Sequence, residues 1–453
     1  FEYKRKPLYT PNDQYYNNQW FLPDINSNDA WDFWNIDNGE TPGNRDVILA
    51  SVDLGVFYQH PDLRDNLWQN LGEDADGDGR TIEGSGSNWY LDPGDLNGID
   101  DDDWDNNAST YIDDLIGWDP SGVSGVDDND PEPPSTWGWS HGTHVAGLLA
   151  SSTNNSTGIA STAFNFSIMS VKVSTENQQN DIYITDGFDG ILYAAKAAYF
   201  SKGFSVINNS WGTTTAINAR SKSSWESSYS TSITSYESLA TNNIISVWAA
   251  GNQGATQVSF EAGIPHYWTS TADHWIAVVA IDTNGKETSY TNRCGVAAAW
   301  CISAPGHAIY SVEDDGTYTN MNGTSQAAPH VAGAIAILIE TFPNLTAKQI
   351  VSRLLDTAST SGLTGYYGES YSEAIFGVGK MDLDKATKPI AVLGLSVAGT
   401  NTSNSTSYTL NSTKLRLSKA FGQNRVVNRI IQRKTNFSQQ ADKTMMASFD
   451  SYD

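Results

Sequence analysis

The sequence has few basic residues, since its 26 Lys and Arg stand against 52 Asp and Glu, for a formal net charge of −26. Phosphate backbones and anionic lipids repel a chain of this sign, which excludes nucleic acid and membrane surfaces as main partners and favours cations. Long apolar runs are also absent, because none approaches the roughly 18 residues that span a bilayer. The chain opens at Phe1 without a Met, a basic segment or an apolar leader, so we expect a processed product.

Cysteine is nearly absent as well, with only Cys294 and Cys301 in the segment "CGVAAAWC". Two thiols without histidines at metal-ligand spacing make a poor zinc site, and a free pair of thiols is the remaining alternative to a disulfide. We favour the disulfide, which would close a small loop and indicates an oxidising compartment. We therefore expect a secreted or extracellular protein.

What the chain does have is enough apolar sequence for a large core, with 39% hydrophobic residues in 453. This length predicts a domain of roughly 300 residues plus appendages. Apolar runs bounded by turn residues alternate with helical patterns, such as those at 187–202 and 224–243. The alternation predicts an α/β fold with a doubly wound, mostly parallel sheet and helices on both faces, whose ligands bind at the carboxyl ends of the strands. The predicted strands are 47–53, 166–173, 204–211, 244–252 and 275–282.

Three polar residues fall where such a sheet would bring them together. Asp53 ends the first apolar run, His141 precedes a small-residue helix in "SHGTHVAGLLA", and Ser325 opens another helix in "NMNGTSQAAPHVAGAIAIL". A serine hydroxyl becomes a nucleophile when an imidazole takes its proton and a carboxylate orients that imidazole. Each residue alone has an ordinary explanation: a strand-end turn, a helix-start backbone contact and an N-cap. Together they predict a catalytic triad.

The segments around these residues, "ASVDLGVFYQHPDL", "SHGTHVAG" and "NGTSQAAPHVAG", resemble the three signature segments of the subtilisin-like serine proteases, in the same order. The resemblance covers roughly residues 1–388 and implies a subtilisin-like serine endopeptidase domain, with an acidic insert at about 70–135. It implies that Ser325 is the nucleophile, His141 the general base and acid, and Asp53 the orienting acid. Leu54 departs from the family's D-[ST]-G pattern, which leaves the hydrogen bonding beside the acid open.

The resemblance also implies how a peptide substrate binds. The segment "VWAAGNQG" is similar to the one that supplies an oxyanion-hole amide, so Asn252 and the Ser325 backbone amide would stabilise the tetrahedral intermediate. The segment "INNSWGTT" is similar to the one that pairs with an extended peptide. None of the implied positions is charged, which favours an apolar or aromatic P1 residue and broad proteolysis. The implied groove and S1 residues are Ser210, Trp211, Gly212, Ala250, Gly251 and Gly263.

Carboxylates are concentrated in and just before a stretch, residues 81–171, that contains neither Lys nor Arg. The segment "DADGDG" places Asp74, Asp76 and Asp78 at alternate positions, as in the first half of an EF-hand-type calcium loop. The twelfth position is Ser85 and not Glu, so another carboxylate must complete the shell. A solvated acidic loop is the alternative to structural calcium. The candidates for completing the shell are Glu83, Asp100, Asp102 and Asp113.

A second calcium site is implied by the resemblance alone. The segments "TNNSTGIA" and "HPDL" are similar to those that together form a common calcium site in the family. The side chains of Asp62 and Asn155 and the carbonyls near Thr157 and Ile159 would be its ligands. An ordinary Asn-rich turn is the alternative.

The segment from 389 to 453 changes character, because it is rich in Ser, Thr and Asn and then becomes basic. It is outside the catalytic signature, and we expect a C-terminal extension or a linker. The "CGxxxxWC" loop, "LRLSKAFG" and the terminal "FDSYD" are similar to passenger regions of Gram-negative subtilase autotransporters, which are displayed at the cell surface before release.

Two hypotheses about function come from different classes. The first is a secreted, calcium-stabilised serine endopeptidase, which we expect to be a monomer acting on protein or peptide substrates. The second is a catalytically silent, calcium-dependent binding or adhesion module on the same fold. The complete triad together with Asn252 favours the endopeptidase.

Overall fold

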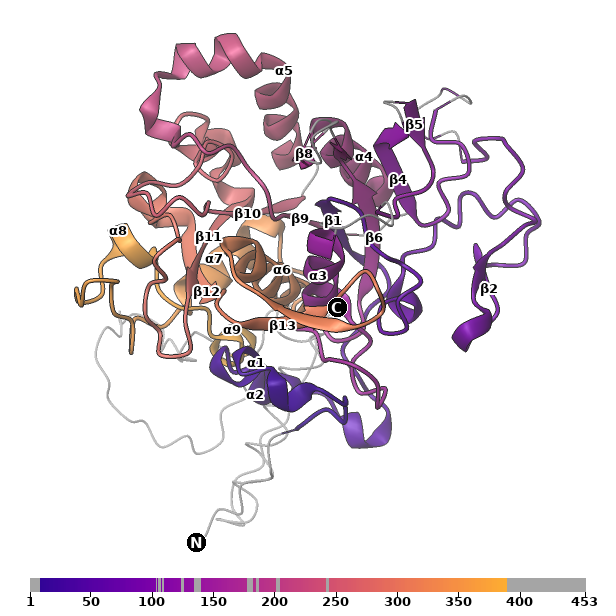
Figure 1. The fold of residues 1–453 in the computed structure, drawn as a ribbon, viewed down its shortest axis with the longest axis horizontal. Helices are drawn as coiled ribbons and strands as arrows, with labels where there is room; N and C mark the ends of the chain where they lie inside the picture. Colours follow the sequence, from indigo (N-terminus) through magenta and orange to yellow (C-terminus); the bar gives the residue numbers. More distant parts are fainter. Residues whose placement is uncertain are drawn as a thin grey trace, which may run out of the picture.

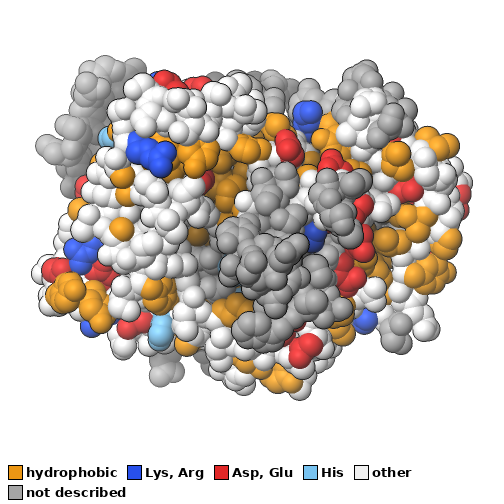
Figure 2. All heavy atoms as spheres, turned by 45° about the horizontal axis from the view of Figure 1, so that its top comes forward, with side chains coloured by type: hydrophobic (Ala, Val, Ile, Leu, Met, Phe, Trp, Pro, Cys, Tyr) orange, Lys and Arg blue, Asp and Glu red, His pale blue; other side chains and the backbone are white. Residues whose placement is uncertain are grey.

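The computed structural model describes residues 9–388, except for 103, 105–106, 108–109, 124–125, 134–139, 177–181, 185–186, 201–203 and 242–243. The predicted C-terminal extension, 389–453, lies outside the described residues, so its separation from the catalytic domain stays a prediction. Within the described residues, no helix combines the length and the apolar character that a membrane span requires. On the face drawn in Figure 2, Lys and Arg side chains are isolated and form no basic patch.

An eight-stranded sheet forms the centre of the molecule, in the order β12-β11-β10-β9-β1-β6-β4-β5 (Figure 1). The pairings from β12 to β4 are parallel, and only β4 and β5 pair antiparallel. The predicted α/β fold with a mostly parallel sheet is therefore confirmed. The strand bounds are β1 Val47–Asp53, β4 Gly117–Val123, β5 Val126–Asp128, β6 Ser167–Lys172, β9 Phe204–Asn209, β10 Ile245–Ala249, β11 Trp275–Ile281 and β12 Cys301–Pro305.

The two faces of the sheet carry separate hydrophobic cores, as the alternation of side chains along β1 demonstrates. Val47 and Leu49 belong to the core that includes α3 and α6, whereas Ile48, Ala50 and Val52 belong to the core that includes α4 and α5. Successive side chains of a strand point to opposite faces, so a strand buried on both faces is apolar throughout. The helix bounds are α1 Phe21–Asp24, α2 Ser27–Trp31, α3 Ser140–Ala150, α4 Gly187–Phe200, α5 Lys222–Thr241, α6 Thr324–Thr341, α7 Ala347–Asp356, α8 Glu373–Phe376 and α9 Leu383–Thr387.

Three two-stranded hairpins lie outside the main sheet, and the sequence patterns did not predict them. They are β2 Ile82–Glu83 with β3 Tyr90–Leu91, β7 Ser174–Glu176 with β8 Ile182–Ile184, and β13 Ile309–Val312 with β14 Tyr318–Met321. The first belongs to the acidic insert, which projects from the side of the sheet that carries β4 and β5 (Figure 1). Near the two ends of the described chain, α2 packs against α9, so an N-terminal helix contacts the last described helix.

The predicted disulfide is present between Cys294 and Cys301. The two cysteines flank a short 3₁₀ helix, Gly295–Trp300, and both are fully buried. The bridge joins the first residue of β12 to the residue just before the 3₁₀ helix, within the core that includes α4 and α5. The free-thiol alternative is therefore wrong for this structure.

Candidate active site

Asp53 and His141 meet at the carboxyl edge of the sheet. Asp53 is the last residue of β1 and is 1% exposed, and His141 lies in the first turn of α3. The His141 Nδ1 atom lies 2.7 Å from Asp53 Oδ1, across 88 residues of chain. Gly142 permits this approach, because a Cβ atom there would lie 2.2 Å from the carbonyl oxygen of Gly55 and 3.2 Å from Asp53 Oδ1.

The electrostatics of the pair suit an orienting acid and a base. Burial opposes the charged form of His141, but the charge and hydrogen bond of Asp53 outweigh it and raise the histidine pKa. The Leu54 backbone amide donates to Asp53 Oδ1 at 2.8 Å. The main chain at Leu54 therefore holds Oδ1, whereas the buried Oδ2 atom of Asp53 has no hydrogen-bond partner among the described residues.

Ser325 lies in the first turn of α6, one residue after the helix begins. Gly323 is the N-cap residue, so Ser325 is not an N-cap and the ordinary explanation for it is wrong. Its Oγ donates to the Ser210 carbonyl at 2.9 Å, and Ser210 Oγ donates in return to the Ser325 carbonyl at 2.8 Å. The hydroxyl is thus hydrogen-bonded to the segment after β9, and no hydrogen bond to His141 is present among the described residues. Such contacts commonly align only when substrate is bound, so this rotamer does not exclude a nucleophile.

Asn252 is oriented by the residue that precedes Ser325. Its Oδ1 atom accepts from the Thr324 amide at 2.9 Å and from Thr324 Oγ1 at 3.0 Å, which directs Nδ2 the other way. A methyl group built on Gly323 would lie 3.4 Å from both Asn252 Nδ2 and the Ser325 amide nitrogen. Two nitrogen donors thus lie at equal distances from one point beside Ser325, and the Gln326 Oε1 atom lies nearer to that point, at 2.7 Å. Paired donors of this kind are what an oxyanion hole requires.

The residues implied to bind peptide follow the ends of β9 and β10. Strand β9 stops at Asn209 and β10 stops at Ala249, so the longer predicted strands each overran into this edge. Trp211 is fixed by its indole N–H, which donates to the Val52 carbonyl at 3.0 Å. Gly251 has φ +108°, a conformation that favours glycine, and its amide donates to Thr324 Oγ1 at 3.2 Å. Ser210 and Gly251 are thereby both tied to the start of α6.

Gly263 and Glu261 give the neighbouring wall. A Cβ on Gly263 would lie 2.4 Å from Ile217 Cγ2, so only glycine fits there. Glu261, which the sequence reasoning missed, is 4% exposed and accepts from the Thr213 amide at 2.8 Å and from Thr213 Oγ1 at 3.2 Å. A Cβ on Gly212 would lie 3.0 Å from its Oε2 atom, and burial raises the pKa of this carboxyl. A carboxylate thus stands directly behind the uncharged groove.

Asp62 and Asn155 lie together, as the resemblance implied. Asp62 is fully buried; Asn155 Nδ2 donates to its Oδ1 at 3.2 Å and the Ile159 amide donates to its Oδ2 at 2.8 Å. Burial raises the pKa of Asp62 to about 8. The Thr157 amide donates to Asn155 Oδ1 at 2.7 Å. Asp13, absent from the sequence prediction, closes the turn by accepting from the Asn155 amide at 3.3 Å.

The "DADGDG" carboxylates gather with partners other than those expected. Asp74 and Asp76 lie with Asp95, and Asp76 and Asp78 lie with Asp92, each trio with ligand oxygens within 4.8 Å of one another. Asp92 and Asp95, both buried, belong to the acidic stretch that was expected to complete the shell, but neither was among the candidates singled out from the sequence.

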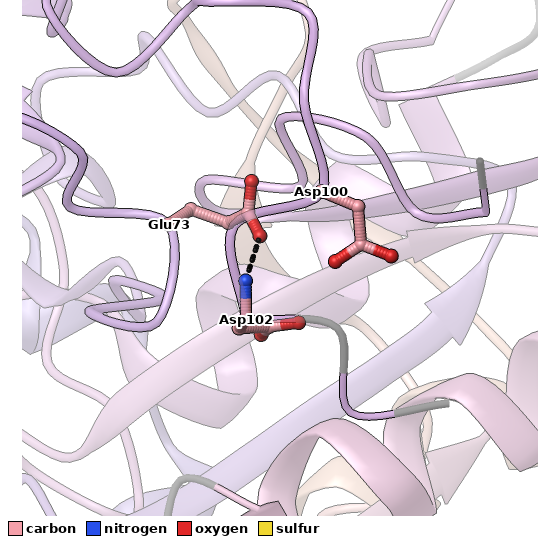
Figure 3. Close-up of side chains that lie close together, drawn as sticks. All are labelled: Glu73, Asp100 and Asp102. Carbon is pink, nitrogen blue, oxygen red and sulfur yellow. Dashed lines mark hydrogen bonds between the residues drawn. The ribbon is translucent and has the colours of Figure 1, made fainter. Parts of the chain in front are cut away.

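Two of the predicted ligands are engaged elsewhere. Glu83 pairs with Arg80 at 2.5 Å, and Asp113 accepts from the amides of Asn97 and Gly98 at 3.1 Å. Neither belongs to a carboxylate trio among the described residues. Asp100 and Asp102 do lie together, with Glu73, in a trio that shares no residue with the "DADGDG" trios (Figure 3).

Comparison with known proteins identifies the scaffold. The model of the subtilase family matches residues 44–379. The chain belongs to the subtilase family. It is 35% identical to subtilisin DY of Bacillus licheniformis over 52% of this chain and 77% of that protein. It is 30% identical to thermitase of Thermoactinomyces vulgaris over 79% of this chain and 95% of that protein.

A solved structure of a protease from Pseudoalteromonas arctica supports the fold alone, with a TM-score of 0.56 and 22% identity over 84% of this chain and 99% of that one. Family membership makes this protein a subtilisin-like serine endopeptidase, and we set aside the silent adhesion module. The likeness to autotransporter passengers stays a prediction, since it depends largely on residues beyond 388.

Proposed function

We propose that Ser325, His141 and Asp53 hydrolyse peptide bonds as a catalytic triad. The observation that carries the proposal is the 2.7 Å contact between Asp53 and His141 Nδ1. Ser325 lies at the same edge, because its hydroxyl bonds Ser210, which follows β9, the neighbour of β1. With Nδ1 held by the carboxylate, Nε2 is the nitrogen left to take the serine proton. Ser325 Oγ then attacks the scissile carbonyl carbon, and His141 returns the proton to the leaving amine. Water, deprotonated by the same imidazole, attacks the acyl-enzyme and releases the acid product.

Asn252 Nδ2 and the Ser325 amide would hold the oxyanion during both steps. The support is their shared approach to the space beside Gly323 and the fixing of Asn252 by Thr324. Donors that are held before the reaction cost no reorganisation when charge develops.

The substrate would bind as an extended chain along the groove formed by residues 210–212 and 250–251. Main-chain pairing gives affinity that is independent of sequence, which suits broad proteolysis. We propose an apolar or aromatic P1 residue, because the groove positions carry no charge. Glu261 is a carboxylate beside them, and its hydrogen bonds with Thr213 together with its raised pKa favour a wall residue over a binder of basic side chains.

Calcium would be a structural ion in this protein. The buried Asp62 and Asn155, whose side chains are 3.2 Å apart, would belong to a site completed by carbonyls near Thr157 and Ile159. Asp74, Asp76 and Asp78, joined by Asp92 and Asp95, fit a second site, because hard oxygen donors of this kind suit calcium. The ion would stabilise the folded chain and would take no part in peptide hydrolysis.

Secretion is the location that the disulfide supports, because such bridges persist in oxidising compartments. We propose that residues 1–388 are the catalytic domain of a secreted monomer and that 389–453 extend or link it.

A casein assay tests the reaction class. Hydrolysis should be abolished by a serine-reactive inhibitor, and Ser325→Ala and His141→Ala should each remove nearly all activity, as should the double variant, because the two residues act as one unit. Full activity in either single variant would refute the assignment.

A peptide series that differs only at P1 tests specificity. Cleavage should be faster after Phe and Leu than after Lys, Arg or Glu. Glu261→Gln, which keeps the shape of the wall, should leave the Phe rate unchanged. Faster cleavage after Lys or Arg that disappears in Glu261→Gln would show that the carboxylate selects substrate and that the apolar prediction is wrong.

A further inference from the structure

A pocket lies at the end of the sheet opposite to the catalytic pair. It has a volume of about 590 Å³, and its lining includes Ile48, near the start of β1, and Ser167, the first residue of β6. These two residues are direct partners in the parallel ladder. Asp53 ends the same strand, five residues after Ile48, which places it roughly 17 Å from the pocket. The pocket is therefore separate from the proposed active site.

Arginine side chains outnumber carboxylates in the lining of this pocket, although the whole chain has two acidic residues for each basic one. Arg45 donates to two neutral acceptors, the Asp65 carbonyl oxygen at 2.5 Å and Asn66 Oδ1 at 3.0 Å. Neither bond neutralises its charge, so the pocket favours an anionic ligand. The lining residues with charged side chains are Arg45, Arg64, Arg80, Asp46 and Asp65.

Arg64 is the lining residue that most directly indicates a missing anion. Its side chain is 18% exposed, and its Nε atom is buried without a hydrogen-bond partner among the described residues. Asp65 Oδ1 is 4.0 Å from Nε, which is beyond hydrogen-bonding distance. A guanidinium keeps its charge at every ordinary pH, so burying one without an acceptor is costly. An anionic group in the pocket would supply that acceptor.

The rest of the wall is aromatic and aliphatic. Trp68 is 4% exposed and Trp89 is half-buried, and both line the pocket. Leu71, another lining residue, is 56% exposed. A guanidinium binds a carboxylate through paired hydrogen bonds, and aromatic rings pack well on one another. The pocket thus fits a peptide segment that carries carboxylates beside aromatic side chains.

The two terminal segments outside the described residues contain one good match to that chemistry. Residues 449–453, "FDSYD", combine two aspartates with two aromatic rings and contain no Lys or Arg. In residues 1–8 the single Glu2 is accompanied by three basic residues, and the rest of 389–453 has only Asp442 as an acidic residue. About 60 residues connect Lys388 to this segment and could extend over as much as ~200 Å, so distance does not prevent contact with the pocket.

We propose that this pocket is a docking site for residues 449–453 of the same chain. An aspartate carboxylate of the segment would accept hydrogen bonds from Arg64, and its aromatic rings would pack on the wall formed with Trp68 and Trp89. The contact would hold the segment on the side of the domain remote from the proposed substrate groove, where the chain cannot cleave it. The inference goes beyond the proposed peptidase function, because no lining residue belongs to the proposed active site.

Disulfide trapping in the full chain tests this contact. On a Ser325→Ala background, Leu71→Cys is combined with Ser451→Cys, and the control combines Tyr367→Cys with Ser451→Cys; intact mass verifies that the chain is uncleaved. Tyr367 is 85% exposed and lies outside the pocket lining, and the two native cysteines are bridged and buried. In a glutathione buffer at low protein concentration, the Leu71 pair should form about tenfold more cross-link than the control pair, because docking raises the local concentration of the segment.

Charge variants of the Leu71 trapping pair test whether arginine recognises the carboxylates. Arg64→Gln should reduce the cross-link about tenfold, which is the order expected for loss of a charge-assisted hydrogen bond. Asp450→Asn together with Asp453→Asn should give a similar reduction. Asp442→Asn, which removes a tail carboxylate outside the segment, should have no effect. If Arg64→Gln fails to fold, as judged by circular dichroism, Arg45→Gln replaces it under the same criteria.

A competing peptide supplies a second readout. The peptide FDSYD, blocked at both ends, should suppress the cross-link at about millimolar concentration, the usual effective concentration of a tethered segment, and FNSYN should not. Equal cross-linking of the Leu71 and Tyr367 pairs would overturn the proposal, because the tail would then contact the surface without preference. A cross-link that persists unchanged in Arg64→Gln would also overturn it. Cross-links formed only between two chains would place the segment of a second copy in the pocket and refute docking within one chain.

Discussion

Removal of the Asn252 amide is the perturbation for which the structure gives the most specific expectation. Asn252→Ala deletes one of two donors that converge beside Gly323, while the Ser325 amide remains. Because the oxyanion exists only in the transition state, the loss should appear in kcat with little change in KM. The expected decrease is about 10²–10³, the range for such a side-chain donor in subtilisin, which is about 2.7–4 kcal/mol.

Thr324 separates the orientation of Asn252 from its presence. Its hydroxyl donates to Asn252 Oδ1 at 3.0 Å, and its amide makes a second bond of 2.9 Å that no side-chain change removes. Thr324→Val keeps the shape and loses the hydroxyl bond to Asn252 Oδ1, together with the 3.2 Å bond that the hydroxyl accepts from the Gly251 amide. One neutral hydrogen bond contributes about 1 kcal/mol, so kcat should fall about fivefold to tenfold, far less than in Asn252→Ala. Thr324→Ser should restore the rate.

Steady-state kinetics on one chromogenic peptide gives kcat and KM for Asn252→Ala, Thr324→Val and Thr324→Ser. Circular dichroism and the melting temperature serve as controls for folding. A main effect of Asn252→Ala on KM would assign the side chain to ground-state binding. A Thr324→Val defect as large as that of Asn252→Ala, not rescued by Ser, would refute the idea that the hydroxyl only orients the amide.

Four further predictions follow from named contacts. Asp53 raises the pKa of His141, and the base must be neutral, so kcat/KM should fall as the pH drops through a value above the ordinary ~6.5. In Asp53→Asn the residual activity should fall at a lower pH, because the carboxylate that raises the histidine pKa is gone. Any stabilisation from the charged pair is present below ~6.5 and is lost as the pH rises through the raised pKa. Gly142→Ala should lower the melting temperature, at a cost of about 1–3 kcal/mol, and reduce kcat, because its Cβ would lie 2.2 Å from a carbonyl oxygen; wild-type melting and rates would contradict the close approach. Alkylation without reductant should add no mass at Cys294 or Cys301, and reduction should cost about 2–3 kcal/mol of stability. Chelation of calcium should lower the melting temperature and speed autolysis. The folded state should lose about 2.7 kcal/mol of stability where free calcium was a hundredfold above Kd. An unchanged melting temperature would mean that the acidic segments are solvated surface.

The sequence was sufficient for those parts of the site that short segments encode. Asp53, His141 and Ser325 each lie in a contiguous signature, and the parallel sheet brings the ends of separate strands to one edge, so the contact of Asp53 with His141 could be predicted, while the role of Ser325 stays a prediction. The predicted ends of β9 and β10 lie two and three residues too far along the chain, because apolar and small residues continue past the last strand-pairing residue into the groove. Periodicity reports burial, and burial does not end where strand pairing ends.

Glu73 and Glu261 were missed for a different physical reason. The EF-hand-like pattern began at Asp74 and drew attention away from the preceding residue, whose partners arrive about thirty positions later. Glu261 lies behind Gly212 only because the chain returns there after β10. Contacts of this kind depend on how loops fold over one another, which no local period or spacing encodes. The sequence signal for Glu73 was its place in an acidic run just before a stretch without Lys or Arg.

The position of the acidic insert indicates why cations should affect lifetime more than chemistry. The Asp53–His141 contact closes 88 residues of chain, and the insert is the middle of that span. Loop-closure entropy grows slowly with length, so the length itself is a small cost, whereas buried like charges are a large one. The insert is attached to the sheet through the pairing of β4 with β6, which stands next to β1. While that pairing holds, Asp53 and His141 keep their positions whether or not ions occupy the insert. Loss of ions would first open the insert to cleavage, so in chelator the initial rate at low temperature should match that with calcium while the half-life shortens. An immediate fall in the initial rate, without loss of intact chain, would mean that the insert positions the catalytic pair directly.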